Sequence, residues 1–335
     1  MKKVICIGSA AKDIFIVLDK TKITENKESL TEKKMMSFEF GAKIYAENLI
    51  EEVGGSAVNV AAGLNLAGIK SFVFARTAKG EVGKWIEKKI GKLKIKKNYL
   101  QCRGATPSSI SAIISDREHL DHTILRTGDS VEEFDLKKAL NKFREKVDWI
   151  YVGSQKKNSL EKMEEIIKFA HNKKAKLAFV PSSYQIENDI NELVKYFKEF
   201  EIIFLNRDEA IEILQNLEVK FKDTPLNLLQ EIKNLGFKNV VITDGANGAY
   251  IRKDIDSFHL EVNKTKKIET VGAGDAFTSG FLASYIESTD IKKSLAWGIV
   301  NSGEVLTKIG ATKGLLTKKE MVNQEKTLIE KIEKI

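Results

Sequence analysis

The stretch Ile202-Ile203-Phe204-Leu205, followed at once by Asn206-Arg207-Asp208-Glu209, contains the unit from which the fold is built. Four consecutive apolar residues predict a strand that is buried on both faces, and the amphipathic stretch 208–217 predicts a helix directly after it. Comparable apolar runs recur at residues 4–8, 72–75, 149–152, 177–180 and 240–243. Amphipathic stretches lie between the later runs, at residues 159–171, 189–199 and 226–235.

This alternation of apolar strands and amphipathic helices is typical of a parallel sheet covered by helices on both faces. The sequence therefore predicts an α/β fold with a doubly wound, mainly parallel sheet. No repeat, low-complexity tract or linker interrupts the pattern, and Pro107, Pro181 and Pro225 each stand at a turn or just after a strand. A single domain spanning residues 1–335 is favoured over two domains.

Two segments, approximately residues 14–50 and 99–127, break this alternation. They contain short alternating pieces such as 109–115 and 122–125, without helices of clear period. Two interpretations remain open: ordinary peripheral strands, or a small antiparallel sheet that projects from the main one. A projecting sheet would lie over a site at the strand ends as a lid, because closure excludes water from the chemistry.

Composition narrows the class of protein. Of the 335 residues, 30% are charged and 42% are hydrophobic, which is typical of a soluble globular protein. Cys6 and Cys102 stand far apart and can form neither a disulfide framework nor a zinc site, so a cytoplasmic location is expected. Since no apolar run approaches the roughly 18–20 residues that span a bilayer, we expect no membrane partner.

The formal net charge of +8 raises the question of nucleic acid. Only 7 of the 55 basic residues are Arg, the side chain that bidentate recognition of bases and phosphates favours. The densest basic cluster, residues 88–97, contains no aromatic side chain for stacking on a base. We therefore expect a Lys-rich surface and no nucleic-acid partner.

The sharpest functional motif is Glu269-Thr270-Val271-Gly272-Ala273-Gly274-Asp275-Ala276-Phe277, which ends a loop and opens a helix. Its two glycines let the backbone turn tightly and approach a ligand, and the N–H groups of the first helical turn form an anion hole. Asp275 has two interpretations. It is either a plain helix cap or a proton acceptor about 3 Å from a phosphate under attack, and a kinase needs such an acceptor beside an anion hole.

A second motif, Gly54-Gly55-Ser56-Ala57-Val58-Asn59, places two glycines before a helix of small residues. This allows a ligand or a neighbouring backbone to come close. Asn59 falls one turn into the helix, where its amide can read substrate hydroxyl groups. The alternative is a Gly-rich helix start in which Asn59 bonds only to its neighbours.

Two further motifs follow predicted strands. Asn206 and Glu209 have the spacing of a helix capping box. Alternatively, they lie at the carboxyl edge of the sheet, where Glu209 would hold Mg²⁺ through water and Asn206 would touch phosphate. The run Thr243-Asp244-Gly245-Ala246-Asn247-Gly248 is either a tight turn into the next strand or a contact for nucleotide phosphates.

All four motifs occur in one order in one α/β chain, and in this the sequence resembles the PfkB family of carbohydrate kinases, the ribokinase-like kinases. The resemblance extends from residue 4 to residue 311, and its most specific parts are GGSAVNVA at 54–61 and TVGAGDAF at 270–277. It implies a doubly wound α/β core with a small β lid. It also implies ATP-dependent phosphorylation of a hydroxyl group on a sugar or sugar-like substrate.

The resemblance also implies roles for particular residues. Asp275 would be the general base, and the N–H groups of Gly272, Ala273 and Gly274 would stabilise charge on the transferred phosphoryl group. Asn206 and Glu209 match a motif that helps bind Mg²⁺ and phosphate, with Glu209 as the metal-binding residue. The other nucleotide-binding positions would be Thr243, Gly245, Gly248 and Thr270, with Asn301 as a candidate adenine contact, and the substrate-binding positions would be Asp13, Gly54, Gly55 and Asn59.

The sequence also departs from the family pattern. Glu269 stands where the family usually has Asp, in a region that binds a monovalent cation in many members, so dependence on K⁺ is an open question. Ser56-Ala57 and Ala11 replace residues of ribokinases proper, which disfavours ribose as the acceptor.

Three hypotheses follow. A kinase of a sugar leads. The alternatives are a nucleoside kinase of the same family, with Phe38, Phe40 or Tyr45 stacking on the base, and a non-catalytic regulator that binds a sugar or nucleotide. Family resemblance and the apolar residues within 14–50 also suggest a homodimer through the lid.

Overall fold

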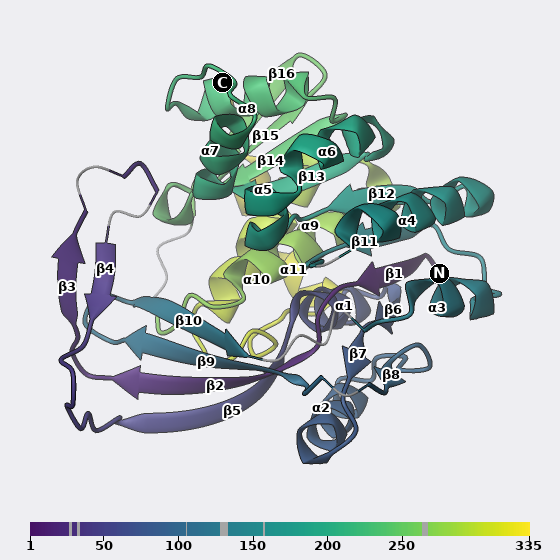
Figure 1. The fold of residues 1–335 in the computed structure, drawn as a ribbon. Coiled ribbons are helices and arrows are strands. Elements are labelled where there is room, and N and C mark those ends of the chain that lie inside the picture. Colours follow the sequence, from purple (N-terminus) through teal and green to yellow (C-terminus); the bar gives the residue numbers. More distant parts are fainter. Residues whose placement is uncertain (27–28, 32–33, 105, 128–132, 157, 263–266) are drawn as a thin grey trace.

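A nine-stranded sheet runs through the centre of the molecule in the computed structural model, which describes all residues except 27–28, 32–33, 105, 128–132, 157 and 263–266 (Figure 1). The strand order is β17-β16-β15-β14-β13-β12-β11-β1-β6. Pairing is parallel from β14 to β6 and antiparallel from β14 to β17. The bounds are Lys3–Ile7 (β1), Lys70–Phe74 (β6), Trp149–Val152 (β11), Lys176–Phe179 (β12), Ile202–Asn206 (β13), Asn239–Thr243 (β14), Ala249–Lys253 (β15), Asp256–Leu260 (β16) and Glu333–Lys334 (β17).

Helices cover both faces of this sheet, so its apolar side chains pack in two separate cores, as predicted. Alternate strand residues point to opposite faces: Val4 and Cys6 lie in one core, and Ile5 and Ile7 lie in the other. The first core is closed by α1 (Ser56–Leu66), α2 (Glu81–Lys92), α9 (Ala273–Ser288), α10 (Ile291–Val305) and α11 (Lys318–Ile329). The second is closed by α3 (Leu136–Lys142), α4 (Ser159–Lys173), α5 (Ser183–Asn188), α6 (Ile190–Leu193), α7 (Arg207–Asn216) and α8 (Pro225–Asn234).

The strand order shows where a ligand belongs. The chain enters the sheet at β1, adds β6 on one side and then adds β11 to β14 on the other. The direction of winding therefore reverses beside β1. In open α/β sheets, ligands bind at the carboxyl ends of the strands near such a point.

A second, four-stranded sheet projects from the carboxyl end of β1 (lower left in Figure 1), which confirms a small separate sheet. The expectation of purely antiparallel pairing is wrong for one pair, because β2 and β9 run parallel. Both strands leave the main body at the same end, where Ala11 pairs with Ser109. In the order β10-β9-β2-β5, the strands are Asp121–Thr127 (β10), Ser109–Asp116 (β9), Ala11–Leu18 (β2) and Asn48–Gly54 (β5), and a hairpin of β3 (Lys22–Glu25) and β4 (Lys34–Ser37) extends beyond them.

The predicted strands and helices agree with the structure to within two residues, apart from one difference. The stretch 189–199 is short α6 followed by the 3₁₀ segment η1 (Val194–Glu199). The short elements β7 (Arg76–Thr77), β8 (Gln101–Cys102) and η2 (Gly245–Asn247) complete the described fold. Within the described ranges, every helix is too short or too polar to span a lipid bilayer.

Candidate active site

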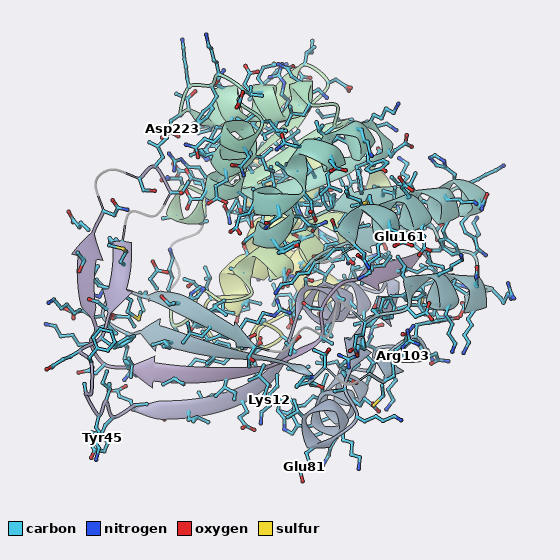
Figure 2. The ribbon with its side chains drawn as sticks, in the orientation of Figure 1. Lys12, Tyr45, Glu81, Arg103, Glu161 and Asp223 are labelled. Atoms are coloured by element: carbon cyan, nitrogen blue, oxygen red, sulfur yellow. The ribbon has the colours of Figure 1, made fainter. Side chains whose placement is uncertain are left out.

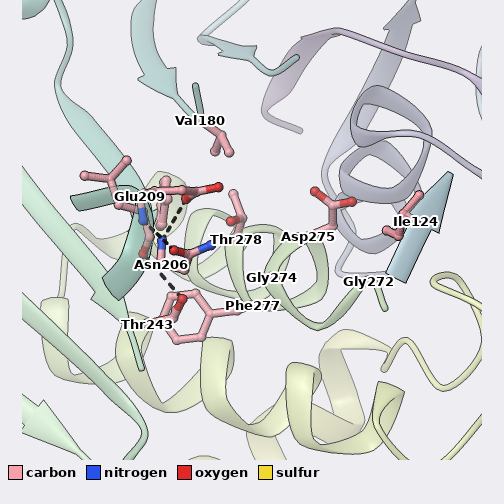
Figure 3. A pocket seen from close by; sticks show the side chains of 12 residues that line it. Ile124, Val180, Asn206, Glu209, Thr243, Gly272, Gly274, Asp275, Phe277 and Thr278 are labelled. Carbon is pink, nitrogen blue, oxygen red and sulfur yellow. Dashed lines mark hydrogen bonds between the residues drawn. The ribbon is translucent and has the colours of Figure 1, made fainter. Parts of the chain in front are cut away.

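A cavity of ≈ 390 Å³ lies at the carboxyl ends of β12, β13 and β14 (Figure 3). The first turns of α9 bound its opposite side, and Ile124 of β10 reaches it from the small sheet. The cavity therefore occupies the edge that the strand order indicates. Among its lining residues are six that the sequence predicted: Asn206, Glu209, Thr243, Gly272, Gly274 and Asp275.

The first turn of α9 contains the glycines from which the sequence predicts an anion hole. Gly272 caps this helix with a φ of 87°, and a Cβ there would lie 2.3 Å from the Cβ of Ala311, so conformation and packing both require glycine. A Cβ at Gly274 would meet no protein atom within 4 Å, which leaves open space beside the backbone. N–H groups in the first turn of a helix have no partner within the helix. Gly272 and Gly274 line the cavity, whereas Ala273 between them does not. The Ala273 N–H is directed back to the carbonyl oxygen of Thr270 (3.3 Å).

Asp275 follows Gly274 in the first turn of α9 and points into the cavity (Figure 3). Its Oδ2 accepts a hydrogen bond of 2.8 Å from Asn59 Nδ2 of α1. Burial, together with the nearby charge of Asp13, raises the pKa of Asp275 to about 6, although the bond from Asn59 opposes this shift. A hydrogen bond thus joins Asn59 of the GGSAVN motif to Asp275 of the GAGD motif.

Asp13 lies on β2 beside Asp275 and is 6% exposed. Burial raises the pKa of Asp13 to about 6, while a hydrogen bond from Ser111 and the charge of Arg126 oppose the shift. Gly54 makes room for it, because a Cβ there would lie 1.7 Å from Asp13 Oδ2. Gly55 meets the backbone of Ser9 in the same manner, and its φ is 98°.

Asn59 is buried beside these carboxylates, and its Oδ1 has no hydrogen-bond partner among the described residues. A buried amide oxygen without a donor is costly. A substrate hydroxyl group is the kind of donor that would satisfy it. The alternative in which Asn59 bonds only to neighbours along α1 does not hold, because its amide reaches Asp275.

Asn206 and Glu209 form the capping box of α7 and also line the cavity, so both sequence interpretations are compatible. The Asn206 side chain accepts from the Glu209 N–H (2.7 Å), and Glu209 Oε2 accepts from the Asn206 N–H (2.8 Å). Burial is the main cause that raises the pKa of Glu209 to about 7, and nearby carboxylates, Glu212 first among them, add to it. Burial thus disfavours the ionised form of Glu209, and a nearby positive charge would stabilise that form.

The fourth motif contributes one residue to the cavity. Thr243 lines it at the end of β14, and its hydroxyl donates to the carbonyl oxygen of Leu205 (3.3 Å). Gly248 belongs to the tight turn, since a Cβ there would lie 2.1 Å from the carbonyl oxygen of Leu260. Gly245 faces open space, with no protein atom within 4 Å of a Cβ. The predicted tight turn between β14 and β15 is therefore present, and it leaves Gly245 accessible.

Besides Gly245 and Gly248, two more predicted nucleotide contacts, Thr270 and Asn301, lie outside the cavity lining. Thr270 precedes the glycines and bonds to His122 of the small sheet. Asn301 is 1% exposed; its Nδ2 donates to the carbonyl oxygen of Ala276 (2.7 Å) and its Oδ1 accepts from the Leu316 N–H (2.9 Å). These bonds join α9, α10 and the loop before α11. We therefore leave Asn301 out of the proposed nucleotide site.

Several lining residues were missed by sequence reasoning. Thr278 lies between Asp275 and the Asn206–Glu209 pair in Figure 3. It could have been found, because it stands three residues after Asp275 and so shares its helical face. The others are apolar and carry no comparable signal: Ile124, Val180, Phe204, Leu205 and Phe277.

Comparison with known proteins settles the class of enzyme. A profile described as the pfkB family of carbohydrate kinases matches residues 1–318. The chain belongs to the pfkB family of carbohydrate kinases. The ATP-dependent 6-phosphofructokinase of Thermoanaerobacterium thermosaccharolyticum is 25% identical over 285 residues, which cover 83% of this chain and 86% of the relative. The 5-dehydro-2-deoxygluconokinase of Bacillus subtilis is 22% identical over 80% of this chain and 85% of the relative.

Solved structures agree with this pfkB fold. The nucleoside kinase of Methanocaldococcus jannaschii, an archaeal member of the ribokinase family, matches with a TM-score of 0.74 over 98% of this chain and 99% of that chain. At 17% identity, this match concerns the fold alone. Family and ribokinase-like fold are thus confirmed. The chain is a kinase, a phosphotransferase with an alcohol group as acceptor, which sets aside the non-catalytic regulator.

Proposed function

We propose that this pfkB kinase transfers the γ-phosphoryl group of ATP to a hydroxyl group of a sugar, with Asp275 as general base and the first turn of α9 as anion hole. One observation carries the proposal: a carboxylate with a pKa of about 6 and the glycines of the same helical turn line one cavity. A base with this pKa is ionised at pH 7 and still basic enough to accept a proton.

In the transfer step, the acceptor oxygen forms a bond to the γ-phosphorus while the bond from that phosphorus to the β–γ bridging oxygen breaks. ADP leaves with the bridging oxygen, and Asp275 accepts the hydroxyl proton. The N–H groups of Gly272 and Gly274 donate to the phosphoryl oxygens, whose charge they stabilise. Asn59 orients the base through its 2.8 Å hydrogen bond.

Mg²⁺ fits the carboxyl edge of β13 through Glu209. Burial raises the pKa of this carboxyl group to about 7, because it disfavours the ionised form. A nearby cation would stabilise the ionised form. Among the described residues, no group of three or more His, Cys, Asp or Glu side chains could hold a metal ion. This suits an ion that takes most of its ligands from phosphate and water. When bound, Mg²⁺ would neutralise phosphate charge, with Glu209 holding it through water and Asn206 touching phosphate.

The acceptor is best sought among sugars and sugar derivatives. The two relatives described above are named as kinases of such compounds: one is a 6-phosphofructokinase and the other is a 5-dehydro-2-deoxygluconokinase. Asp13 and the unsatisfied Oδ1 of Asn59 present acceptors for hydroxyl groups near Asp275. The stacking residues of the nucleoside alternative do not line the cavity: Phe40 and Tyr45 are almost fully exposed, and Tyr45 lies at the outer corner of the small sheet (Figure 2).

ADP release in the presence of ATP and Mg²⁺ tests the proposal. The acceptor panel contains fructose, fructose 6-phosphate, 5-dehydro-2-deoxygluconate, adenosine and inosine. We expect a sugar or sugar derivative to give the highest kcat/KM, by about tenfold or more. A preference for a nucleoside would overturn the sugar assignment. Binding of these compounds without ATP consumption would overturn the transfer reaction itself.

We also propose that the small sheet acts as a lid within a single kinase domain. Ile124 is the residue through which it reaches the cavity, and the same face carries Asp13 beside the base. A sheet that supplies both a wall and a substrate contact excludes water when it lies over the acceptor. Ile124→Gly should therefore raise ATP hydrolysis in the absence of an acceptor, measured as ADP release.

A homodimer through the outer face of this lid is the final part of the proposal. Alternating register places Leu49 and Leu125 on the face opposite Asp13, and they are 64% and 57% exposed. Exposed apolar residues gathered on one face of a sheet indicate a protein partner. A second copy of the chain would cover the same face on both subunits. Leu125→Glu should then convert a dimer to a monomer in light scattering, and a monomeric wild type would overturn the assignment.

A further inference from the structure

The small sheet makes a second contact with the catalytic side of the main body, at the loop that leads into α9. Ser115 of β9 and His122 of β10 are direct cross-strand partners, so their side chains point to the same face of the sheet. The Ser115 hydroxyl donates to Glu269 Oε2, and His122 Nδ1 lies 2.9 Å from Thr270 Oγ1. The lid hairpin thus bonds to two consecutive residues just before the anion hole.

The environment of Glu269 consists of hydrogen-bond donors. This residue is 4% exposed, and its Oε1 accepts from the N–H groups of Thr270 (2.8 Å) and Val271 (3.1 Å), while Ser115 donates to Oε2. His122 Nδ1 lies 3.7 Å from Oε1. A monovalent cation at this carboxylate would compete with three donors and with an imidazole ring. The residues of this loop therefore do not fit a resident K⁺.

Thr270 connects the lid to the anion hole. Its hydroxyl bonds to His122, and its carbonyl oxygen accepts from the N–H of Ala273, the first residue of α9 (3.3 Å). Ala273 stands between Gly272 and Gly274, the glycines that line the cavity. A displacement of Thr270 would therefore shift the N–H groups that face the phosphoryl group.

We propose that His122 is a positioning residue, whose ring holds Thr270, and through it the first turn of α9, in the arrangement of the anion hole, in place of a monovalent cation. The consequence for transfer rests on the proposed kinase mechanism, whereas the ordering of the loop does not. Because His122 belongs to the lid, the anion hole is complete when the lid lies over the cavity. Phosphoryl transfer is then coupled to closure, which protects ATP from water.

Three variants separate positioning from general stability of the hairpin. His122→Ala removes the contact, and His122→Asn restores a hydrogen-bonding atom near the position of Nδ1. His119→Ala is the matched control: His119 lies in the same hairpin, and its Nδ1 is 2.9 Å from Asp116 Oδ2, within the β9–β10 turn. Each variant is assayed for kcat, for KM of ATP, and for hydrogen exchange of the segment 268–275. Wild-type turnover is also compared in KCl, NaCl and choline chloride.

We expect His122→Ala to lower kcat about tenfold or more, with KM for ATP within about twofold, since small displacements of catalytic groups can cost up to 10²-fold. His122→Asn should recover much of the loss. Exchange in 268–275 should become faster in His122→Ala and stay unchanged in His119→Ala. Equal effects of the two Ala variants, or unchanged exchange in His122→Ala, would overturn the positioning role.

The cation comparison and the exchange measurement keep the two proposals apart. Wild-type rates in the three salts should agree within about twofold at matched ionic strength. A rate in KCl that exceeds the rates in the other two salts by much more than twofold would contradict the proposal that His122 takes the place of a monovalent cation. If no acceptor supports ATP consumption, the kinase mechanism fails, and faster exchange of 268–275 in His122→Ala still supports the ordering of the loop.

Discussion

The two sides of the cavity are built in different ways. On the β13 side, Asn206 and Glu209 bond to each other within one turn of chain. On the α9 side, Asp275 bonds to Asn59, which is 216 residues away in sequence, and senses the charge of Asp13 on the small sheet. The first side is fixed by local structure, whereas the second exists only after three distant elements meet. Asp275, which we propose as the general base, therefore lies on the side whose geometry depends on tertiary structure.

Removal of the tuned carboxylate should have the largest effect. Asp275→Asn keeps the shape and can still bond to Asn59, but it cannot accept a proton. We expect kcat to fall about 10²–10⁴-fold, with nucleotide affinity by calorimetry nearly unchanged. Asp256→Asn, at a surface ion pair with Lys334, is the control and should retain activity. Weakened nucleotide binding with preserved kcat would refute the assignment of the base.

Two substitutions at Glu209 test the β13 side of the cavity, which is held by hydrogen bonds within one turn of chain. Glu209→Gln removes the charge but keeps a capping box, because Gln also serves at this position of the helix. Glu209→Ala removes the charge and the bond to the Asn206 N–H, while the Asn206 side chain still caps the backbone N–H of residue 209. We expect KM for Mg·ATP to rise about tenfold in both variants, and Tm to fall only in Glu209→Ala, by an amount that corresponds to one lost hydrogen bond, about 1 kcal/mol. Equal Tm values would show that the box contributes nothing to stability.

The pKa of about 7 at Glu209 adds a pH dependence to this side. Mg²⁺ requires the ionised carboxylate, so the apparent affinity for Mg²⁺ should weaken as pH falls below 7, by up to about tenfold per unit. In Glu209→Gln this dependence should disappear. Titration of activity with Mg²⁺ at pH 6 and pH 8 measures both. A dependence that persists in the Gln variant would assign it to another group.

The same contrast explains how far the sequence predicts the structure. Continuous apolar runs specify buried parallel strands, and the strand–helix junction at Asn206 and Glu209 specifies both a cap and a place at the sheet edge, because all of this information is local. The bond between Asn59 and Asp275 depends on how α1 packs against α9, which no short stretch encodes. Asn301 is the opposite case: its place in the chain made it a candidate adenine contact, whereas in the structure its amide bonds within the core.

Asn59 offers a test of how distant elements tune the base. Its hydrogen bond favours the ionised form of Asp275, so Asn59→Ala should raise the pKa of Asp275 above its value of about 6. Activity requires the ionised base, so the acid limb of the kcat profile should move to higher pH. A bond to a charged group contributes about 1.5 kcal/mol or more, which corresponds to about one pH unit. Asn65→Ala on the same helix, whose amide donates to backbone carbonyl groups, should leave the limb in place.

The smallest effect is expected on stability, at Asp13. Its pKa in the folded protein, about 6, lies above that of an unfolded Asp, about 3.9, so the folded state binds the proton more tightly. The stability that this group contributes is complete below pH 3.9 and is lost as pH rises through 6.

At pH 8 the buried charge of Asp13 opposes folding, whereas an Asn in its place would not. We therefore expect Asp13→Asn to raise Tm by about 2–5 °C at pH 8 and by less at pH 5, measured by calorimetry on the free protein. Asp256→Asn again serves as control, since it removes an exposed carboxylate. A lower Tm for Asp13→Asn at pH 8 would mean that the ionised side chain stabilises the fold, and that its burial reflects structure and not the binding of an acceptor.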